Sequence, residues 1–367
     1  MDIVEATRGY EAWLGAELGR MGLAPVVADL REKRRRMAKE DAFVFLRATY
    51  YRWAQLWPQL CPELARAPQA LAAGDLHLEN FGTWRDREGR LCWGINDFDE
   101  AYALSYANDL VRLAASASLA VEAGRFAAAP AALADAILDG YAAGLERFQP
   151  FVLEERNLEL RAMAYHKEKE PARWWKKLGK ELFLQRPPAA ARAALDADLS
   201  RAELAKAGHF YRSAGTGSLG RPRYVLRAEW RGGLLAREAK ALVPSAAAWA
   251  ARHKSARPRY ADVRHQSAGC LDPLLRVEEG WVVRRLAPRS SKIELDCLRR
   301  KSDPLALLRA MGRAVANLHH GSAAAIPAIK RDLARRKSHW LRDSAARMAD
   351  AMREDRRAWK RSGAWRK

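Results

Sequence analysis

A short stretch at residues 74–82 carries side chains whose types and spacing fit phosphoryl transfer. It holds Asp75 and, five residues later, Asn80, and Asp97 follows after a short apolar run. Phosphoryl transfer needs one carboxylate to orient the acceptor hydroxyl, and it needs an amide oxygen and a second carboxylate to hold Mg²⁺ against the phosphates. Mg²⁺ takes a few oxygen ligands from a protein and keeps several waters. We therefore predict that Asp75 orients the acceptor and that Asn80 and Asp97 bind the metal.

Three neighbouring polar residues have supporting roles in this interpretation. Asp99 could hold a second metal ion, or it could pair with the basic groups around it. We expect His77 to make hydrogen bonds within the loop rather than to act as a base. We expect Asn108 and Asp109 to cap a helix from 110 to 123, because a short polar acceptor satisfies the free amides of a first turn. Asp109 would also support the loop through hydrogen bonds.

A second candidate region lies far along the chain, where glycines form the pattern G-x-G-x-x-G between two apolar segments. Small residues let backbone amides approach phosphate oxygens, so the candidate nucleotide-binding residues are Gly215, Thr216, Gly217, Ser218 and Gly220. The flanking pattern predicts a glycine turn between antiparallel strands, with Lys240 on the partner strand. A plain hairpin is one alternative for the glycines. A Rossmann site is another, but it requires a helix after them.

The elements that must position these residues are mostly helices before residue 150 and strands after residue 205. Apolar periodicity and proline positions predict helices over about 5–21, 33–57, 131–148 and 304–320, and strands over 91–95 and 281–286. Pro58 and Pro62 are expected to end the second helix. The turn-forming segment 85–90 should form a hairpin that returns Asp97 to the side of Asn80.

Length, charge and cysteine pattern narrow the class of protein. The chain has 367 residues, enough for two lobes, and a formal net charge of +21. No apolar run reaches the roughly 18 to 20 residues that span a bilayer, and we find no secretory signal. The four cysteines have no zinc-ligand or redox spacing. We therefore expect a cytoplasmic protein with reduced cysteines.

The positive charge allows two explanations. A basic surface attracts polyanions, and the segment 330–367 is strongly basic while containing none of the site residues, so we predict that it contacts polyanions. The alternative is a solvated basic surface of compositional origin. Trp174–Lys177 could be a basic-aromatic nucleic-acid contact, although a packed helix edge is the simpler interpretation.

Three segments taken together resemble the aminoglycoside-phosphotransferase and choline-kinase branch of the protein-kinase-like fold. That branch carries a Gly-Asp-x-His-x-x-Asn loop, an Ile-Asp-x-Asp/Glu segment and an Asp-Leu-Ala helix start, which match residues 74–82, 97–100 and 108–114 here. The chain is also similar to an uncharacterised bacterial family, domain of unknown function 2252, at residues 33–37, 43–47, 74–82, 215–220 and Lys240. Basic positions of that family, at Arg47, Arg285 and Lys292, could bind phosphate or an acidic substrate, and a plain surface role is an equal alternative.

The resemblance implies an ATP- and Mg²⁺-dependent phosphotransferase in which Lys240 contacts the α- and β-phosphates. In ordinary kinases the glycine loop and lysine precede the catalytic Asp, whereas here they follow it. We therefore predict an α+β, two-lobed kinase-like fold in permuted order, with a mostly helical large lobe and a small antiparallel β lobe. Residues 1–204 would form the helical catalytic lobe, residues 205–290 the nucleotide-cradling lobe, and residues 291–367 a hinge and C-terminal helices that pack back on the helical lobe.

Two other functions fit the same residues. The chain could be an inactive nucleotide- or nucleic-acid-binding module, although the presence of Asp75, Asn80 and Asp97 together favours an enzyme. It could also be a nucleotidyl transferase that binds the nucleotide reversed and transfers AMP to the acceptor. In each enzymatic case the acceptor is an unidentified hydroxyl compound.

Overall fold

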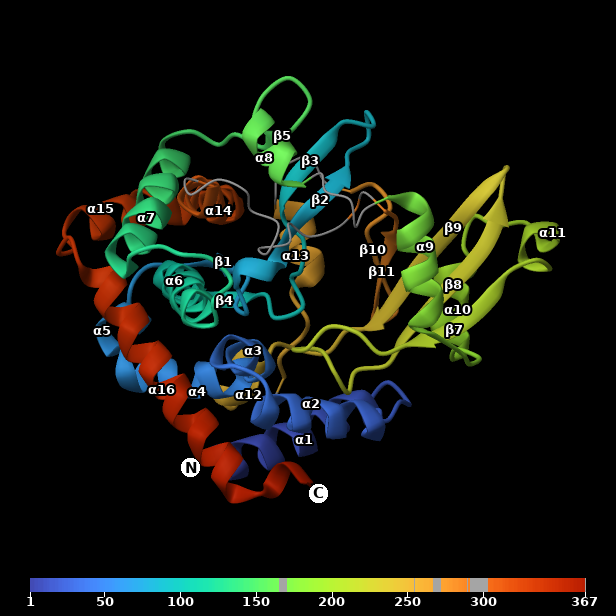
Figure 1. Cartoon of the computed structure of the whole chain (residues 1–367), viewed down its shortest axis with the longest axis horizontal. Coiled ribbons are helices and arrows are strands. Elements are labelled where there is room, and N and C mark those ends of the chain that lie inside the picture. The colour runs from blue at the N-terminus through green and yellow to red at the C-terminus, as the bar shows by residue number, and fades with distance from the viewer. Residues whose placement is uncertain (165–169, 254, 267–271, 289, 291–302, 367) are drawn as a thin grey trace.

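The computed structural model describes residues 1–164, 170–253, 255–266, 272–288, 290 and 303–366. These residues form an α+β fold whose sheets are antiparallel, which confirms the predicted fold class. Figure 1 shows most helices on one side of the molecule and the largest sheet on the other. Lys292, Cys270 and Cys297, and the start of the predicted hinge, lie outside the described residues, whereas Cys61 and Cys92 are free and buried.

The largest sheet has six strands in the order β10-β11-β9-β8-β7-β6. Its strands are β6 (Leu182–Leu184), β7 (Gly208–Arg212), β8 (Arg223–Trp230), β9 (Gly233–Ala241), β10 (Arg276–Glu278) and β11 (Trp281–Leu286). Helix α9 (Pro171–Lys180) directly precedes β6, and four more helices lie between these strands in the sequence, namely α10 (Ala189–Asp196), α11 (Arg201–Leu204), α12 (Ala246–Ala250) and α13 (Tyr260–Gln266). The sheet thus includes one strand, β6, that precedes the predicted lobe boundary at residue 205.

Helices form most of the rest of the molecule. They are α1 (Ile3–Gly19), α2 (Val27–Lys39), α3 (Ala42–Ala48), α4 (Tyr50–Leu60), α5 (Pro62–Ala65), α6 (Tyr106–Glu122), α7 (Pro130–Glu146), α8 (Leu158–Ala164), α14 (Asp303–His319), α15 (Ile326–Ala334) and α16 (Trp340–Ser362). Glycines in α7 and α14 allow these two helices to pack very closely. A Cβ at Gly140 would lie 1.8 Å from the Arg309 carbonyl oxygen, and one at Gly312 would lie 2.1 Å from the Ile137 carbonyl oxygen.

Two small sheets frame residues 74–82. One pairs β1 (Gln69–Ala72) with β4 (Tyr102–Ser105), and the other contains β2 (Phe81–Arg85), β3 (Leu91–Ile95) and β5 (Phe151–Val152). The β2–β3 hairpin aligns Phe81 with Ile95, and the Asn96 amide donates to the Asn80 carbonyl oxygen at 2.9 Å. The predicted return of the chain from Asn80 to Asp97 is therefore present.

The predicted helix over 33–57 is wrong, because this segment contains parts of three helices. The helical conformation is interrupted at Asp41, whose carboxylate accepts a hydrogen bond from the Val44 amide at 2.9 Å and caps α3. It breaks again at Thr49, where φ is −125° and ψ is 41°. The apolar period continues across both breaks, so it could not reveal them. Pro58 lies inside α4 rather than ending it, and the helix ends at Leu60.

The predicted start of the helix that follows β4, at residue 110, is also wrong. Helix α6 begins at Tyr106, and its N-cap is Ser105, whose hydroxyl accepts from the Ala107 amide at 3.2 Å. Asn108 and Asp109 therefore lie in the first turn instead of capping it. Their side chains contact other segments, because the first turn is fully buried.

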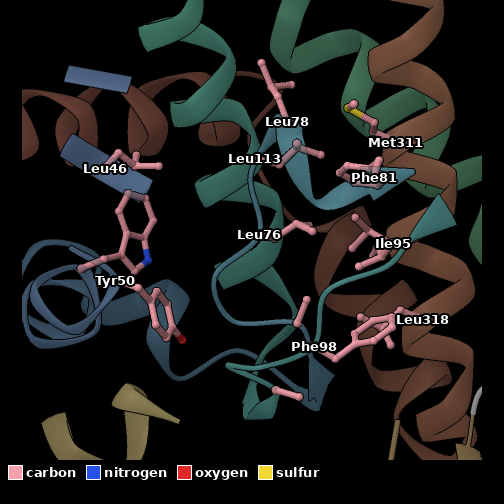
Figure 2. Packing of buried hydrophobic residues seen from close by; sticks show 14 of the residues in the cluster. Leu46, Tyr50, Leu76, Leu78, Phe81, Ile95, Phe98, Leu113, Met311 and Leu318 are labelled. Atoms are coloured by element: carbon pink, nitrogen blue, oxygen red, sulfur yellow. The ribbon is translucent and has the colours of Figure 1, made fainter. Parts of the chain in front are cut away.

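The core surrounds residues 74–82 rather than either end of the chain. Leu76, Leu78 and Phe81 are buried, and they lie among Leu113 of α6 and Met311 of α14 (Figure 2). The apolar residues of this stretch therefore anchor it to the core. Such anchoring limits how far Asp75 and Asn80 can move.

Helix α16 packs back on the helical half (Figure 1). Its buried face contains Leu341, Met348, Met352 and Trp359, and the Trp359 indole donates to the Arg34 carbonyl oxygen at 3.1 Å. Removing residues 330–367 would therefore expose core surface. Polyanion binding by this segment must be tested with charge changes on its exposed side. In the described part of the chain, no helix is both long and apolar enough to cross a membrane.

We expect reversal of three exposed cations of α16, in the variant Arg357→Glu, Lys360→Glu, Arg361→Glu, to weaken binding to a short single-stranded oligonucleotide. Each lost phosphate contact should reduce the slope of log affinity against log salt concentration by about 0.7. The matched control reverses three exposed cations elsewhere, Arg87, Arg156 and Arg186, with the same change in net charge. Equal weakening in both variants would mean that binding follows net charge and not this surface.

Candidate functional site

The segment 74–82, here called the catalytic loop, is fixed by backbone contacts at its start. Gly74 has φ of +77°, and a Cβ there would lie 2.3 Å from the Glu100 carbonyl oxygen, so only glycine fits. The Asp109 carboxylate accepts from the Ala73 amide at 2.8 Å and from the Gly74 amide at 3.0 Å. Asp109 is fully buried. It therefore lies where the sequence analysis expected it, in support of the loop.

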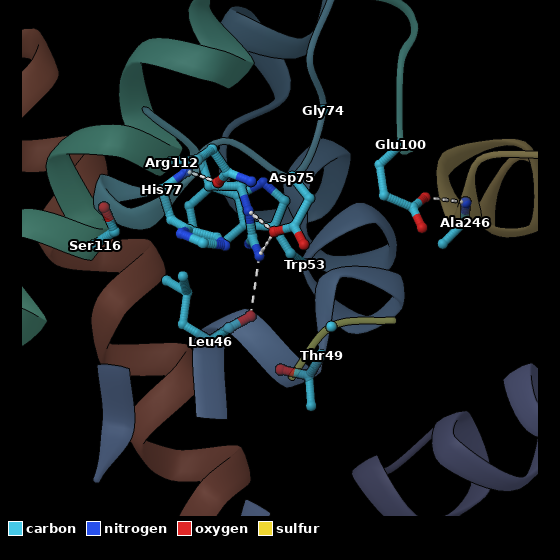
Figure 3. A network of polar contacts seen from close by, with 12 residues as sticks. Leu46, Thr49, Trp53, Gly74, Asp75, His77, Glu100, Arg112, Ser116 and Ala246 are labelled. Atoms are coloured by element: carbon cyan, nitrogen blue, oxygen red, sulfur yellow. Dashed lines mark hydrogen bonds and ion pairs between the residues drawn. The ribbon is translucent and has the colours of Figure 1, made fainter. Parts of the chain in front are cut away.

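Asp75 points at a buried arginine that the sequence analysis did not identify. Arg112 Nε donates to Asp75 Oδ1 at 2.9 Å, and Arg112 Nη2 contacts the same oxygen and donates to the Leu46 carbonyl oxygen at 2.9 Å (Figure 3). The guanidinium lies over the rings of Tyr50 and Trp53, 4.9 and 4.8 Å from their centroids. Burial raises the pKa of Asp75, and Arg112 opposes part of that rise. A carboxylate with a raised pKa is a better proton acceptor.

His77 and Asn80 form a closed turn through their own side chains. The His77 amide donates to Asn80 Oδ1 at 2.8 Å, and the Glu79 amide donates to His77 Nδ1 at 3.2 Å. His77 therefore makes the expected contacts within the loop. The amide oxygen of Asn80 has two lone pairs, so this hydrogen bond leaves one lone pair for a further ligand.

Asp97 and Asp99 share one buried lysine. Lys240 Nζ lies 3.6 Å from Asp97 Oδ1 and closer still to Asp99 Oδ2. Burial by itself would raise the pKa of Asp97, but Lys240 and Arg284 outweigh it and the pKa is lowered. Burial and the neighbouring Asp97 raise the pKa of Asp99. The pKa values of the two carboxylates are therefore shifted in opposite directions.

The polar atoms around these carboxylates fit a bound cation. Within the described residues, Asp99 Oδ1 is buried and has no hydrogen-bond partner. An orphaned buried oxygen is costly, and a cation between Asp99, Asp97 and Asn80 would satisfy it. No group of three or more His, Cys, Asp and Glu side chains in the described part of the chain is arranged for metal binding. The set here has two carboxylates and an amide, a donor set that suits Mg²⁺ because it retains waters.

Residues 215–220, here called the glycine loop, fold onto the catalytic loop. Gly215 and Gly220 have φ of +78° and +99°. A Cβ at Gly217 would lie 2.9 Å from the Arg47 carbonyl oxygen and 3.3 Å from Asp75 Oδ2. Glycine is therefore needed where the two loops meet. Together they line one pocket, here called the central pocket, with Arg47, Asp75, Asn80, Asp97, Asp99 and residues 215–218 in its wall.

A larger cavity of about 330 Å³ adjoins the central pocket. The two linings share Asp97, Gly215 and Ser218. The cavity, here called the arginine-lined cavity, is bounded by Trp84 and Trp174 and by Arg212, Arg223, Arg284 and Arg285. Trp174 lies 4.8 Å from Trp175 in an edge-to-face pair that packs on Leu178, so this pair is a packed helix edge that also faces the cavity.

Glu238 is a buried residue beside the site that the sequence analysis did not name. It is fully buried and pairs with Arg212, Arg223 and Arg284 at 2.8, 2.7 and 2.9 Å. Burial alone would raise its pKa, but these three arginines hold the pKa of Glu238 well below its ordinary value. Glu238 lies two residues before Lys240 on β9, so both point to the same face of the sheet. That alternation was the signal available in the sequence.

Two arginines, Arg47 and Arg221, line the central pocket, and Arg285 lies at the arginine-lined cavity. Arg47 pairs with Glu79 at 2.8 Å, so a residue of the catalytic loop already neutralises part of its positive charge. Arg221 is 2% exposed, contacts Glu100, and lies 3.7 Å from Asp99. Arg285 is exposed at the wall of the arginine-lined cavity. Of these, the sequence analysis named Arg47 and Arg285 but not Arg221.

Comparison with known proteins finds a family match over the first part of the chain. Residues 26–186 match the family DUF2252, described as an uncharacterized protein conserved in bacteria. No curated protein and no solved structure gives a significant match to the chain. The matched residues include the catalytic loop, Asp97 and Arg112, and the glycine loop and Lys240 lie beyond them.

Proposed function

We propose that this protein, which matches the DUF2252 family model over residues 26–186, is an ATP- and Mg²⁺-dependent phosphotransferase with kinase-like lobes in permuted order. One observation carries the proposal. The glycine loop and Asp75, which are remote in sequence, meet in one pocket together with Asn80 and Asp97. Lys240 lies at the same place, in contact with Asp97 and Asp99. A structural Asp-rich turn has no reason to collect these groups.

The order of strands in the large sheet supports the same proposal. In protein kinases a glycine-rich loop covers the phosphates, and the lysine lies on the third strand. Here the glycine loop joins β7 to β8, and Lys240 lies on β9 opposite Arg223.

The protein's own residues divide the work of the proposed reaction. Asp75, held by Arg112, accepts the proton of the acceptor hydroxyl. At the same time the hydroxyl oxygen of the acceptor forms a bond to the γ-phosphorus, and the bond between that phosphorus and the β,γ-bridging oxygen breaks. Amides of the glycine loop and Lys240 hold the phosphates. Asn80, Asp97 and Asp99 would hold Mg²⁺, which supplies charge neutralisation at the phosphate oxygens. Lys240 would then exchange a carboxylate partner for a phosphate.

A second reaction, nucleotidyl transfer, is favoured by one specific observation. The cavity beside the central pocket, where a nucleoside would lie in a kinase, is bounded by four arginines. Guanidinium groups bind phosphate well, so a reversed nucleotide could place its β- and γ-phosphates there and present the α-phosphate to the acceptor. Incubation with γ-labelled and α-labelled ATP separates the two reactions, because the product retains the γ label in one and the α label in the other. Binding without either product would indicate an inactive module.

We expect MgATP to stabilise the protein against heat. At a concentration 100 times the dissociation constant, ligand binding to the native state contributes about 2.7 kcal/mol, which should raise the melting temperature by several degrees. The measurement is a thermal unfolding curve with MgATP, with ATP and EDTA, and with Mg²⁺ alone. A melting temperature that stays unchanged with saturating MgATP, and with the other magnesium nucleotides, would contradict the nucleotide site.

A further inference from the structure

Helix α2 supports the glycine loop along one of its faces. The Val26 amide donates to the Gly220 carbonyl oxygen at 3.0 Å, and a Cβ at Gly220 would lie 2.4 Å from Leu30 Cδ2. One turn further along, Lys33 Nζ donates to the Gly217 carbonyl oxygen at 2.9 Å. Positions 26, 30 and 33 follow the i, i+4, i+7 spacing of a single helix face. The helix therefore holds the loop at Gly220 and at Gly217.

Lys33 is buried without a carboxylate partner. The residue is 4% exposed, and no carboxylate in the described part of the chain lies within ion-pair distance of it. Its ammonium lies over the stacked rings of Tyr10 and Tyr51, 5.3 and 5.7 Å from their centroids. Burying an unpaired ammonium is costly, and the two aromatic faces offset only part of that cost. A purely structural role would be better filled by an apolar side chain.

The Lys33 contact falls at the point of the glycine loop that lies nearest the catalytic Asp. On its other side, Gly217 lies against the Arg47 carbonyl and Asp75 Oδ2. We infer that Lys33 is a positioning residue that holds the glycine loop over Asp75 through its bond to the Gly217 carbonyl. The role in turnover rests on the proposed function, whereas the hold on the loop can be measured without any ligand.

The charge state of Lys33 changes within an accessible pH range. Burial, and then the charge of Arg221, lower the pKa of Lys33 to about 8, while Glu11, Glu100 and Asp75 oppose this shift. The other groups that face it, Tyr10 and Tyr51, have pKa values raised by burial and stay neutral there. Charge-assisted hydrogen bonds are the stronger kind. The hold on Gly217 should therefore weaken as pH rises through about 8.

The lowered pKa of Lys33 also determines in which direction pH changes the stability of the protein. An unfolded lysine has a pKa of about 10.4, so between about pH 8 and 10.4 the unfolded chain binds more protons than the folded one. The penalty for burying this ammonium is therefore full below about pH 8 and is lost as pH rises to about 10.4. Replacing Lys33 with an apolar residue should not lower stability at pH 7.

The test compares Lys33→Met with Lys39→Met, an exposed lysine at the end of the same helix. Amide hydrogen exchange of residues 215–218 is measured without ligand. We expect about tenfold faster exchange in Lys33→Met, the loss of one hydrogen bond to a charged donor, with an unchanged or higher melting temperature at pH 7. Lys39→Met should match the wild type. A wild-type profile from pH 7 to 9, corrected for intrinsic exchange, should show protection of this segment falling through about pH 8.

Two results would overturn the inference. One is exchange in Lys33→Met that equals the wild type, together with a lowered melting temperature, which is the behaviour of a structural lysine. The other is wild-type protection that does not change between pH 7 and 9, a measurement that needs no variant. Failure of the wild type to bind MgATP would count against the proposed function alone, because the exchange experiment contains no nucleotide.

Discussion

Asp97→Asn should abolish Mg²⁺-supported nucleotide binding while the protein stays folded. Lys240 and Arg284 lower the pKa of Asp97 despite its desolvation, so this carboxylate is ionised. In the proposed site it lies beside both the magnesium ion and the nucleotide. The substitution removes that charge and leaves the shape. Changes to groups that only support a metal ligand cost about 10- to 100-fold in affinity, and we expect a larger loss for the ligand itself. Calorimetric titration of MgATP into the variant measures it.

Two comparisons show whether this loss belongs to the site. Lys240→Ala should weaken nucleotide binding and leave acceptor affinity unchanged, because the proposed reaction has its ammonium hold the phosphates. Asp139→Asn removes an exposed charge on α7, 63% of whose side chain is accessible, and should match the wild type. If Asp97→Asn and Lys240→Ala both lowered the melting temperature but bound MgATP normally, the acidic cluster would be structural and the kinase-like proposal would be wrong.

Asp75→Asn should reduce turnover by about 10²- to 10⁴-fold, the usual loss when proton transfer is removed. Nucleotide affinity should stay nearly intact, because in the proposed reaction this side chain faces the acceptor. Asn retains an oxygen that can accept from Arg112, but it leaves that fully buried guanidinium without a counter-charge. Breaking a buried ion pair costs about 3 to 5 kcal/mol, so a lower melting temperature is also expected. Turnover must therefore be compared below the unfolding transition of the variant.

The pH dependence separates lost chemistry from lost stability. Burial raises the pKa of Asp75 above its ordinary value of about 3.9, and the base must be ionised to accept a proton. Wild-type kcat/KM should therefore rise with pH through this raised pKa. The residual activity of Asp75→Asn should lack that acid limb. A variant that kept the same limb would show that another group accepts the proton.

Local features of the site could be read from the sequence because they depend on neighbouring residues. The polar segment 85–90 between two short apolar runs forms the hairpin that returns Asp97 to Asn80. The glycine turn and the alternation that follows it place Lys240 on the partner strand, opposite Arg223. Helix α14 likewise begins within one residue of its predicted start, because its apolar face has a clear helical period. Turn residues and periodicity carry this information.

Contacts between distant segments were decided only by the tertiary structure. Arg112 on α6 pairs with Asp75, and Lys33 on α2 donates a hydrogen bond to the Gly217 carbonyl oxygen. Glu238 forms ion pairs with three arginines that come from three different strands. Each role depends on burial and on a partner that no local pattern specifies. The breaks at Asp41 and Thr49 were also missed, because the apolar period continues across them while Asp41 caps α3 and Thr49 leaves helical geometry. Residue type and spacing thus determined which groups could do chemistry, and packing decided which charges face them, because desolvation and Coulomb energy depend on position in space.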